Sequence, residues 1–148
     1  SDLVVGFGVD VEWFRVSEYP DWGVKVTDSL AQAWEEKLKS IDENYRLFLK
    51  HWDYRWMPPS YRGDIVFVDD SQMFNQFEEM YQEFTTDWAK TFYPNPVYFQ
   101  IGYVNDKKWW NEFTQPVKIM GDSLNQGIDQ EIGIFWVDFT LRDLFPEI

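Results

Sequence analysis

Hydrophobic residues gather in five short runs that are apolar on both faces or nearly so. Runs of this kind are typical of strands in a parallel sheet that is covered by helices. Helical patterns or loop-like segments separate the runs, so strand and helix alternate along the chain. This alternation predicts an α/β protein with a mainly parallel sheet and right-handed crossovers. The predicted strands span residues 3–14, 45–52, 64–70, 97–103 and 132–139.

Two of the connections have the periodicity of amphipathic helices. Asp28 can cap a helix over residues 29–41. A longer helix is predicted over residues 72–92, starting after Asp70 or Ser71, and its core-facing stripe is Met73, Phe77, Met80, Phe84 and Trp88. Residues 106–130 predict a shorter or broken helical connection, and residues 53–63, with two prolines and no periodicity, predict a loop.

The alternation of side chains separates two possible folds, an open doubly wound sheet and part of an eight-stranded barrel. In the first run, Gly6, Gly8, Asp10 and Glu12 share one face, while the other face is apolar. Polar residues also collect late in the other runs, where barrel active sites are built. This pattern favours a (β/α) barrel of TIM type, and the alternative is an open five-stranded doubly wound sheet. Because a complete barrel takes about 250 residues, residues 1–148 are expected to form one barrel domain that lacks its amino-terminal strands.

Composition narrows the classes of partner. A net charge of −13 disfavours nucleic acid, which binds clustered Lys and Arg. No apolar run is long enough for a membrane-spanning helix, so we expect no membrane partner. The absence of cysteine excludes disulfides and thiolate metal sites, and it leaves the compartment open, extracellular included. Aromatic residues make up 20% of the chain, and a carbohydrate site is one use for them, because aromatic rings stack on sugars.

Two carboxylates end the first run. Strand geometry places the side chains of Asp10 and Glu12 on the same side, with their Cβ atoms about 6–7 Å apart. In a partly desolvated barrel mouth, one negative charge near another raises the proton affinity of at least one of them. Glu12 is therefore predicted to act as a general acid, and Asp10 to orient a substrate group. The alternative is that both acids accept hydrogen bonds from loop N–H groups or pair with Lys50.

The spacing Gly6-x-x-x-Asp10-x-Glu12 at the end of an apolar strand resembles the signature of glycoside hydrolase family 18, the chitinase-like barrels. Glu12 falls on the general acid of that family and Asp10 on the aspartate beside it, whereas Val5 and Gly8 stand at positions where the family has further aspartates. The resemblance implies that this run is the fourth strand of the barrel and that the chain covers strands four to eight. An amino-terminal segment or a partner chain would then complete the barrel.

The resemblance also implies a reaction and a binding site. Chemistry would be retaining cleavage of N-acetylated β-linked sugars, with the substrate's own acetamido oxygen as nucleophile. The expected partner is therefore an oligosaccharide or polysaccharide. Trp136 matches the tryptophan beneath the sugar, Asp70 matches a strand-six aspartate, and Asp69 stands at that element's tyrosine position. The predicted sugar-binding residues are Trp136, Gln100, Tyr103, Asp70, Lys50, Asp138 and Trp13.

Two other functions are kept as alternatives. One is a carbohydrate-binding barrel without catalysis. The other is a divalent-metal-dependent barrel enzyme in which Asp10, Glu12, Asp69, Asp70 and Asp138 converge on a cation. The main prediction includes neither a cofactor nor a metal ion. His51 is expected to be a hydrogen-bonding wall residue rather than a base, and Trp109 and Trp110 either line a sugar subsite or pack in a helix.

Overall fold

The computed structural model of the chain describes residues 3–19, 21 and 23–147, which form one parallel sheet with helices. The strands lie in the order β1-β2-β3-β4-β5, and every neighbouring pair is parallel. The predicted α/β class is therefore confirmed. The described strands leave the sheet open, as the alternative prediction had it, and do not close into a barrel. The strands are β1 Gly6–Asp10, β2 Arg46–Lys50, β3 Ile65–Asp69, β4 Val97–Ile101 and β5 Ile132–Trp136.

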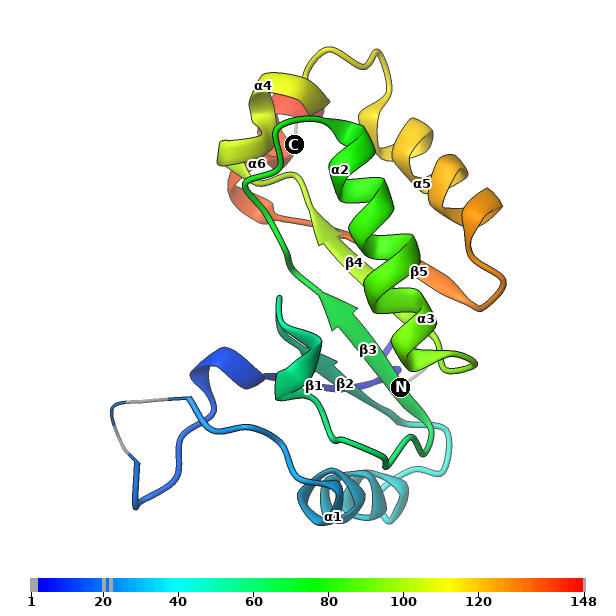
Figure 1. Cartoon of the computed structure of the whole chain (residues 1–148). Coiled ribbons are helices and arrows are strands. Elements are labelled where there is room, and N and C mark those ends of the chain that lie inside the picture. Colours follow the sequence, from blue (N-terminus) through cyan, green and yellow to red (C-terminus); the bar gives the residue numbers. More distant parts are fainter. Residues whose placement is uncertain (1–2, 20, 22, 148) are drawn as a thin grey trace.

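The helices lie in the connections and after the last strand (Figure 1). One long helical segment follows β3 and combines α2, a π-helical stretch and α3. The connection between β4 and β5 is broken into α4 and α5, as the sequence predicts. Helix α6, which follows β5, was not predicted. The bounds are α1 Asp28–Lys39, α2 Phe77–Gln82, the π-helix Glu83–Trp88, α3 Ala89–Phe92, α4 Lys107–Trp110, α5 Pro116–Gly127 and α6 Asp138–Leu144.

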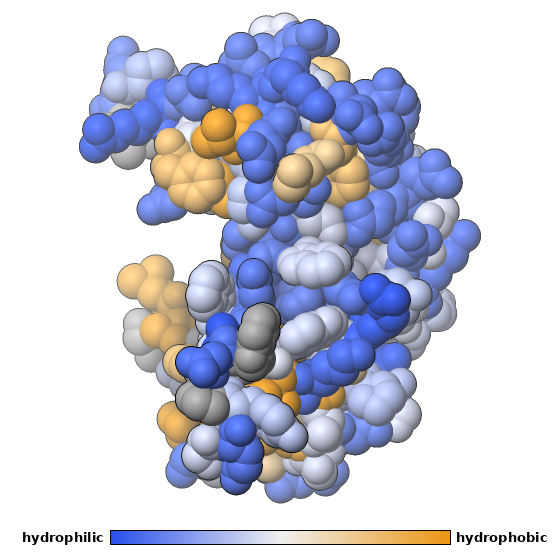
Figure 2. All heavy atoms as spheres, turned by 60° about the vertical axis from the view of Figure 1, so that its left-hand side comes forward, coloured by the Kyte–Doolittle hydropathy of each residue, from blue (hydrophilic) through white to orange (hydrophobic). Residues whose placement is uncertain are grey.

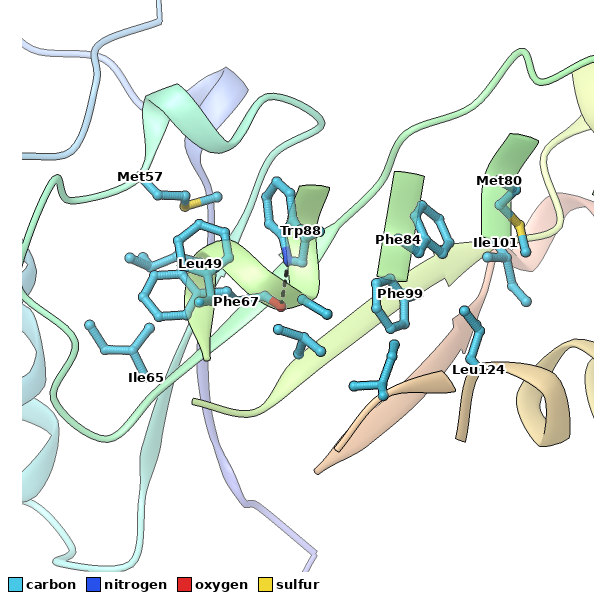
Figure 3. Packing of buried hydrophobic residues seen from close by; sticks show 14 of the residues in the cluster. Leu49, Met57, Ile65, Phe67, Met80, Phe84, Trp88, Phe99, Ile101 and Leu124 are labelled. Carbon is cyan, nitrogen blue, oxygen red and sulfur yellow. Dashed lines mark hydrogen bonds between the residues drawn. The ribbon is translucent and has the colours of Figure 1, made fainter. Parts of the chain in front are cut away.

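The hydrophobic core lies between one face of the sheet and the helices (Figure 3). Phe99 of β4 stacks on Phe84, with ring centroids 4.4 Å apart, and Phe67 of β3 stacks on Phe92 at 4.0 Å. The indole of Trp88 donates a 3.2 Å hydrogen bond to the backbone oxygen of Phe67. Burying each large apolar side chain contributes about 1.5–3 kcal/mol. This face therefore supplies most of the stability of the fold.

The starts of the helices differ in detail from the prediction. Helix α1 begins at Asp28 because Thr27 is the cap, its hydroxyl accepting a 3.2 Å hydrogen bond from the backbone nitrogen of Leu30. The second helix begins at Phe77 rather than after Asp70 or Ser71. Met73 has a φ of 72° and is 71% exposed, so the prediction that it begins the core stripe is wrong. The buried carboxylate of Asp106 lies beside the backbone N–H groups of Met73 and Phe74, so a residue distant in sequence contacts the segment that precedes the helix.

The face of the sheet opposite the helices is strongly curved. In a flat sheet, β2 and β5 would lie about 14 Å apart, three strand spacings. Yet the ring centroids of Phe48 on β2 and Phe135 on β5 are 6.4 Å apart, and Tyr98 on β4 contacts both rings. Arg46 of β2 also pairs with Glu131, which precedes β5, at 3.0 Å. We call this inward-curving surface the concave face, and the space-filling view shows the molecule hollowed between an upper and a lower part (Figure 2).

Candidate functional site

The concave face carries a cavity of about 400 Å³. The strand register explains its lining: Asp10 pairs with Lys50, and Gln100 pairs with Phe135, so all four side chains point to the same side. Asp10, Lys50 and Gln100 lie near the carboxyl ends of their strands, Phe48 lies two residues before Lys50, and Phe135 lies beside Gln100. The residues that line the cavity are Val5, Gly8, Val9, Asp10, Phe48, Lys50, Val68, Gln100 and Phe135.

Lys50 lies between two carboxylates at this end of the sheet. Its Nζ atom is 2.8 Å from Oδ2 of Asp10 and 2.5 Å from Oδ2 of Asp70. These two oxygens are therefore no more than 5.3 Å apart, the sum of the two distances. Burial alone would lower the pKa of Lys50, but the hydrogen bonds and charges of both carboxylates outweigh it and raise the pKa above its usual value. Lys50 thus carries a positive charge that holds the two acids together.

The carboxylates keep acceptor capacity that the protein does not use. Within the described part of the chain, Oδ1 of Asp10 and Oδ1 of Asp70 are buried and have no hydrogen-bond partner. Buried acceptors are normally paired, because leaving one unpaired costs about 1–3 kcal/mol. These two atoms are closed to solvent, so the exposed polar surface of the cluster belongs to the side chains of Lys50 and Asp10, which are 21% and 33% exposed.

Two further polar groups complete the wall. The side-chain nitrogen of Gln100 donates a 2.5 Å hydrogen bond to the hydroxyl of Tyr103. Burial and the negative charge of Asp70 raise the pKa of Tyr103 to about 12. Its phenol therefore stays protonated at neutral pH. The structure thus brings together five of the residues predicted for the site: Asp10, Lys50, Asp70, Gln100 and Tyr103.

The prediction that Asp10 and Glu12 share one face is wrong. Strand β1 ends at Asp10, and Val11–Trp13 forms a 3-10 turn in which Val11 is buried in the core. The alternation of a strand therefore stops before Glu12. The side chain of Glu12 is exposed and does not line the cavity. Trp13 is 67% exposed, outside the cavity, and lies beneath the guanidinium of Arg15.

The prediction that Trp136 faces the interior is also wrong, because the residues of β5 that face the concave side are the other alternate set, which includes Phe135. Trp136 pairs with Ile101, a core residue, and its indole donates a 2.9 Å hydrogen bond to Thr140. The preceding residue, Phe135, faces the cavity instead. Asp138 is exposed in the first turn of α6, where its charge suits the helix dipole, and it does not line the cavity.

The five acids proposed as metal ligands do not converge. Asp69 points toward the helices, opposite to Asp70, and lies fully buried near Ser71 and Glu83. Burial, with the charge of Glu83, raises the pKa of Asp69 well above its usual value. In the described ranges, no three His, Asp or Glu side chains are close enough together to hold a metal ion.

His51 and the tryptophan pair of α4 have structural environments. His51 is buried between the rings of Trp52 and Trp56, and its Nδ1 accepts a 2.8 Å hydrogen bond from the backbone nitrogen of Asp53. Burial lowers its pKa, which favours the neutral imidazole expected of a wall residue. Trp109 and Trp110 are both buried and donate to backbone oxygens, so the packing alternative describes them.

The aromatic floor of the cavity was missed in the sequence. It consists of Phe48 and Phe135, and Tyr98, next to the cavity on the concave face, contacts both rings. The sequence contained part of this information. Alternation along a strand places Phe48 on the same side as Lys50, and it places Tyr98 on the same side as Gln100. Phe135 was placed on the opposite side because the other alternate set of β5 residues was assigned to the concave side.

The described chain has no helix that combines the length and apolarity needed to cross a bilayer. Comparisons of the chain with protein-family models, with curated proteins and with solved structures find no match. The function must therefore be argued from the geometry of the site.

Proposed function

We propose that the concave face binds an oligosaccharide. The observation that carries this proposal is a cavity in which the charged side chains of Asp10 and Lys50 lie beside the rings of Phe48 and Phe135. Asp70, outside the lining, holds Lys50 in place by an ion pair. A sugar ring has an apolar face of C–H groups and an edge of hydroxyl groups, so it needs both kinds of surface side by side. Ligand pockets generally combine a mostly apolar lining with a few fixed polar groups in this way.

The polar groups suit hydroxyl recognition. Carboxylates accept hydrogen bonds from adjacent hydroxyls, and the ammonium of Lys50 donates to the oxygens between them. Asp10, Lys50 and Gln100 line the cavity and together offer an acceptor, a donor and an amide to a ligand that is rich in hydroxyl groups. Because Lys50 already fixes both carboxylates, binding would lose little side-chain freedom.

We also propose that the sheet is a segment of a (β/α)8 barrel, corresponding to strands four to eight. Three features support this: the strands follow one another in chain order, the core lies on one face only, and the other face curls until β2 and β5 side chains meet. An amino-terminal segment or a partner chain would complete the barrel by pairing with β1. Hydrogen exchange tests this proposal. A completing strand would slow the exchange of the β1 amides that point away from β2, whereas rapid exchange of these amides would contradict the proposal.

Glycoside hydrolysis is the second candidate function. It is favoured by Asp10, which lines the cavity beside Lys50 and lies two residues before Glu12, the residue that the chitinase-like resemblance makes the general acid. In the reaction implied by the chitinase-like resemblance, Glu12 protonates the leaving oxygen and Asp10 orients the substrate's acetamido group. Glu12 follows Asp10 by two residues, so this reaction requires the 3-10 turn to move Glu12 over the cavity when sugar is bound.

Calorimetric titration with oligomers of N-acetylglucosamine and of glucose tests binding. We expect saturable binding to the wild type and a loss of about tenfold or more in Lys50→Met, because hydrogen bonds to charged groups contribute about 1.5–3 kcal/mol. Lys37→Met, on the exposed surface of α1, is the matched control. Binding that is equal in both variants, or absent from the wild type, would reject the proposal.

Turnover of a chromogenic N-acetylglucosaminide tests the second candidate. We expect Glu12→Gln to remove turnover while leaving binding intact, because the substitution removes a proton donor outside the cavity. Asp129→Asn, an exposed residue remote from the concave face, is the control. Binding without turnover in the wild type would leave a carbohydrate-binding protein and exclude the hydrolase.

A further inference from the structure

A second cavity, of about 530 Å³, lies on the helical side of the sheet. It occupies the place of a missing crossover helix. Parallel strands are usually joined by an α-helix, but residues 51–64 between β2 and β3 contain only the 3-10 turn Tyr54–Trp56 (Figure 1). The space between the start of α1 and the end of α3 is therefore only partly filled by this loop.

Three cations line the cavity, Lys25, Arg55 and Arg62, and no Asp or Glu lines it. This reverses the balance of the whole chain, which has 26 acidic and 13 basic residues. Arg55 pairs with Asp53 through its Nε and Nη2 atoms, which leaves its Nη1 donors free. Lys25 is exposed and forms no hydrogen bond or ion pair with the described residues.

Arg62 is held in place by the core. Its Nη1 atom donates a 2.9 Å hydrogen bond to the backbone oxygen of Pro58. Its guanidinium lies over the rings of Phe67 and Phe92, 5.6 and 5.3 Å from their centroids. These contacts fix the position of a positive charge that a ligand can meet without ordering a flexible side chain. The other walls are mostly apolar. They come from Val26, Met57, Pro58, Pro59 and Phe92, together with Thr27, Tyr54 and Thr91.

We infer that this cavity binds an organic anion, a phosphate monoester or a carboxylate that carries an apolar group. The cations would neutralise the anionic end, with Arg62 as the fixed partner, and the proline and phenylalanine walls would cover the apolar end. The volume lies within the range of small-molecule pockets. The inference is independent of the sugar proposal, because the two cavities lie on opposite faces of the sheet.

Calorimetric titration with phenyl phosphate, benzoate and phenol tests the inference. We expect saturable binding of at least one of the two anions, weakened by added salt, and no saturable binding of uncharged phenol. Binding of phenyl phosphate alone or of benzoate alone would identify the anionic group. Equal binding of phenol, or no binding of either anion, would overturn the inference.

Two variants locate the site. Lys25→Gln should weaken anion binding about threefold, since exposed ion pairs contribute about 0.2–1 kcal/mol. Arg62→Gln should weaken it about tenfold or more, as expected for a charged hydrogen bond. Lys37→Gln removes the same charge from the far end of α1 and should leave binding unchanged. Because Arg62 also packs on the core, its variant is used only if its circular dichroism matches the wild type. If it does not match, Lys25→Gln alone tests the site. Equal affinities of Lys25→Gln and Lys37→Gln would overturn the inference.

Discussion

The two faces of the sheet are built by alternate residues of the same strands, yet they differ in how their acidic side chains are paired. Asp69 and Asp70 are neighbours in sequence and point to opposite faces. Asp69 is buried on the helical face beside another acid, Glu83, and burial raises its pKa. Asp70, on the concave face, is ion-paired with Lys50 at 2.5 Å.

This difference separates what stabilises the fold from what prepares a site. A buried acid without a cation opposes folding at neutral pH, because its charged form loses hydration without compensation. An acid paired with a lysine stays in position and can meet a ligand. The helical face therefore stabilises the fold through buried apolar side chains, whereas the concave face holds charged side chains in fixed positions. The following experiments test that division, from the largest expected effect to the smallest.

Truncation of the core should cost the most. Phe67→Ala removes a ring that is fully buried between the sheet and α3, so we expect the free energy of unfolding to fall by about 3–5 kcal/mol. Phe135→Ala removes the same group from the concave face, where the residue is 41% exposed, and should cost about 1 kcal/mol. Urea denaturation measures both. Equal losses would show that the two faces contribute alike to stability.

Replacing the buried acid should stabilise the protein. Because the pKa of Asp69 is raised in the folded state, the folded state binds more protons than the unfolded state, and the stability linked to this group falls as pH rises above about 4. Asp69→Asn keeps the hydrogen bond from the backbone nitrogen of Ser71 and removes the charge. We expect a gain of about 1–3 kcal/mol at pH 7, shrinking toward pH 4. Urea denaturation across this pH range measures the difference, with Asp129→Asn as the control. If Asp69→Asn is less stable than the wild type at pH 7, the buried acid does not oppose folding.

Removing the cation from the concave face should have the opposite sign. Lys50→Met leaves Asp10 and Asp70 facing each other without a counter-charge, so we expect a loss of about 1–2 kcal/mol at pH 7 after allowing for partial exposure. The loss should shrink as salt is added, because ions screen the repulsion between the two carboxylates. Urea denaturation at pH 7 in about 0.05 M and about 1 M sodium chloride measures the difference. A loss that does not depend on salt would mean that Lys50 acts through packing rather than charge.

The strands were predictable because their signal is local. Each apolar run contains its strand, and the observed strand is shorter than the run by zero to four residues at each end. The faces of Lys50 and Gln100 also follow from simple alternation within β2 and β4. These features need no knowledge of distant contacts, so the sequence was sufficient for them.

The register of β5 and the start of α2 depend on distant residues. A side chain at Gly133 would overlap the ring of Tyr98, and a side chain at Gly102 would overlap the indole of Trp136. The rings of Tyr98 and Trp136 therefore pack directly against these two glycines. This packing fixes which residues of β5 face the helices, and Phe135 then points toward the cavity. Likewise, Asp106 contacts the segment before α2 from more than thirty residues away. Local periodicity contains none of this information, because a shift of one residue in a strand reverses every side chain.

The pair Phe135 and Trp136 therefore gives the most discriminating test, although its effect is the smallest. Phe135→Ala should weaken oligosaccharide binding about threefold to tenfold, because an aromatic contact contributes about 0.5–1.5 kcal/mol. Trp136→Phe should leave binding unchanged and lower stability instead, since the indole bonds to Thr140 and packs edge-on against Trp110 on the helical side. Calorimetric titration and urea denaturation of both variants separate the effects. If Trp136→Phe weakens binding while Phe135→Ala does not, the tryptophan faces the sugar as the chitinase-like resemblance implies, and the register described here is wrong.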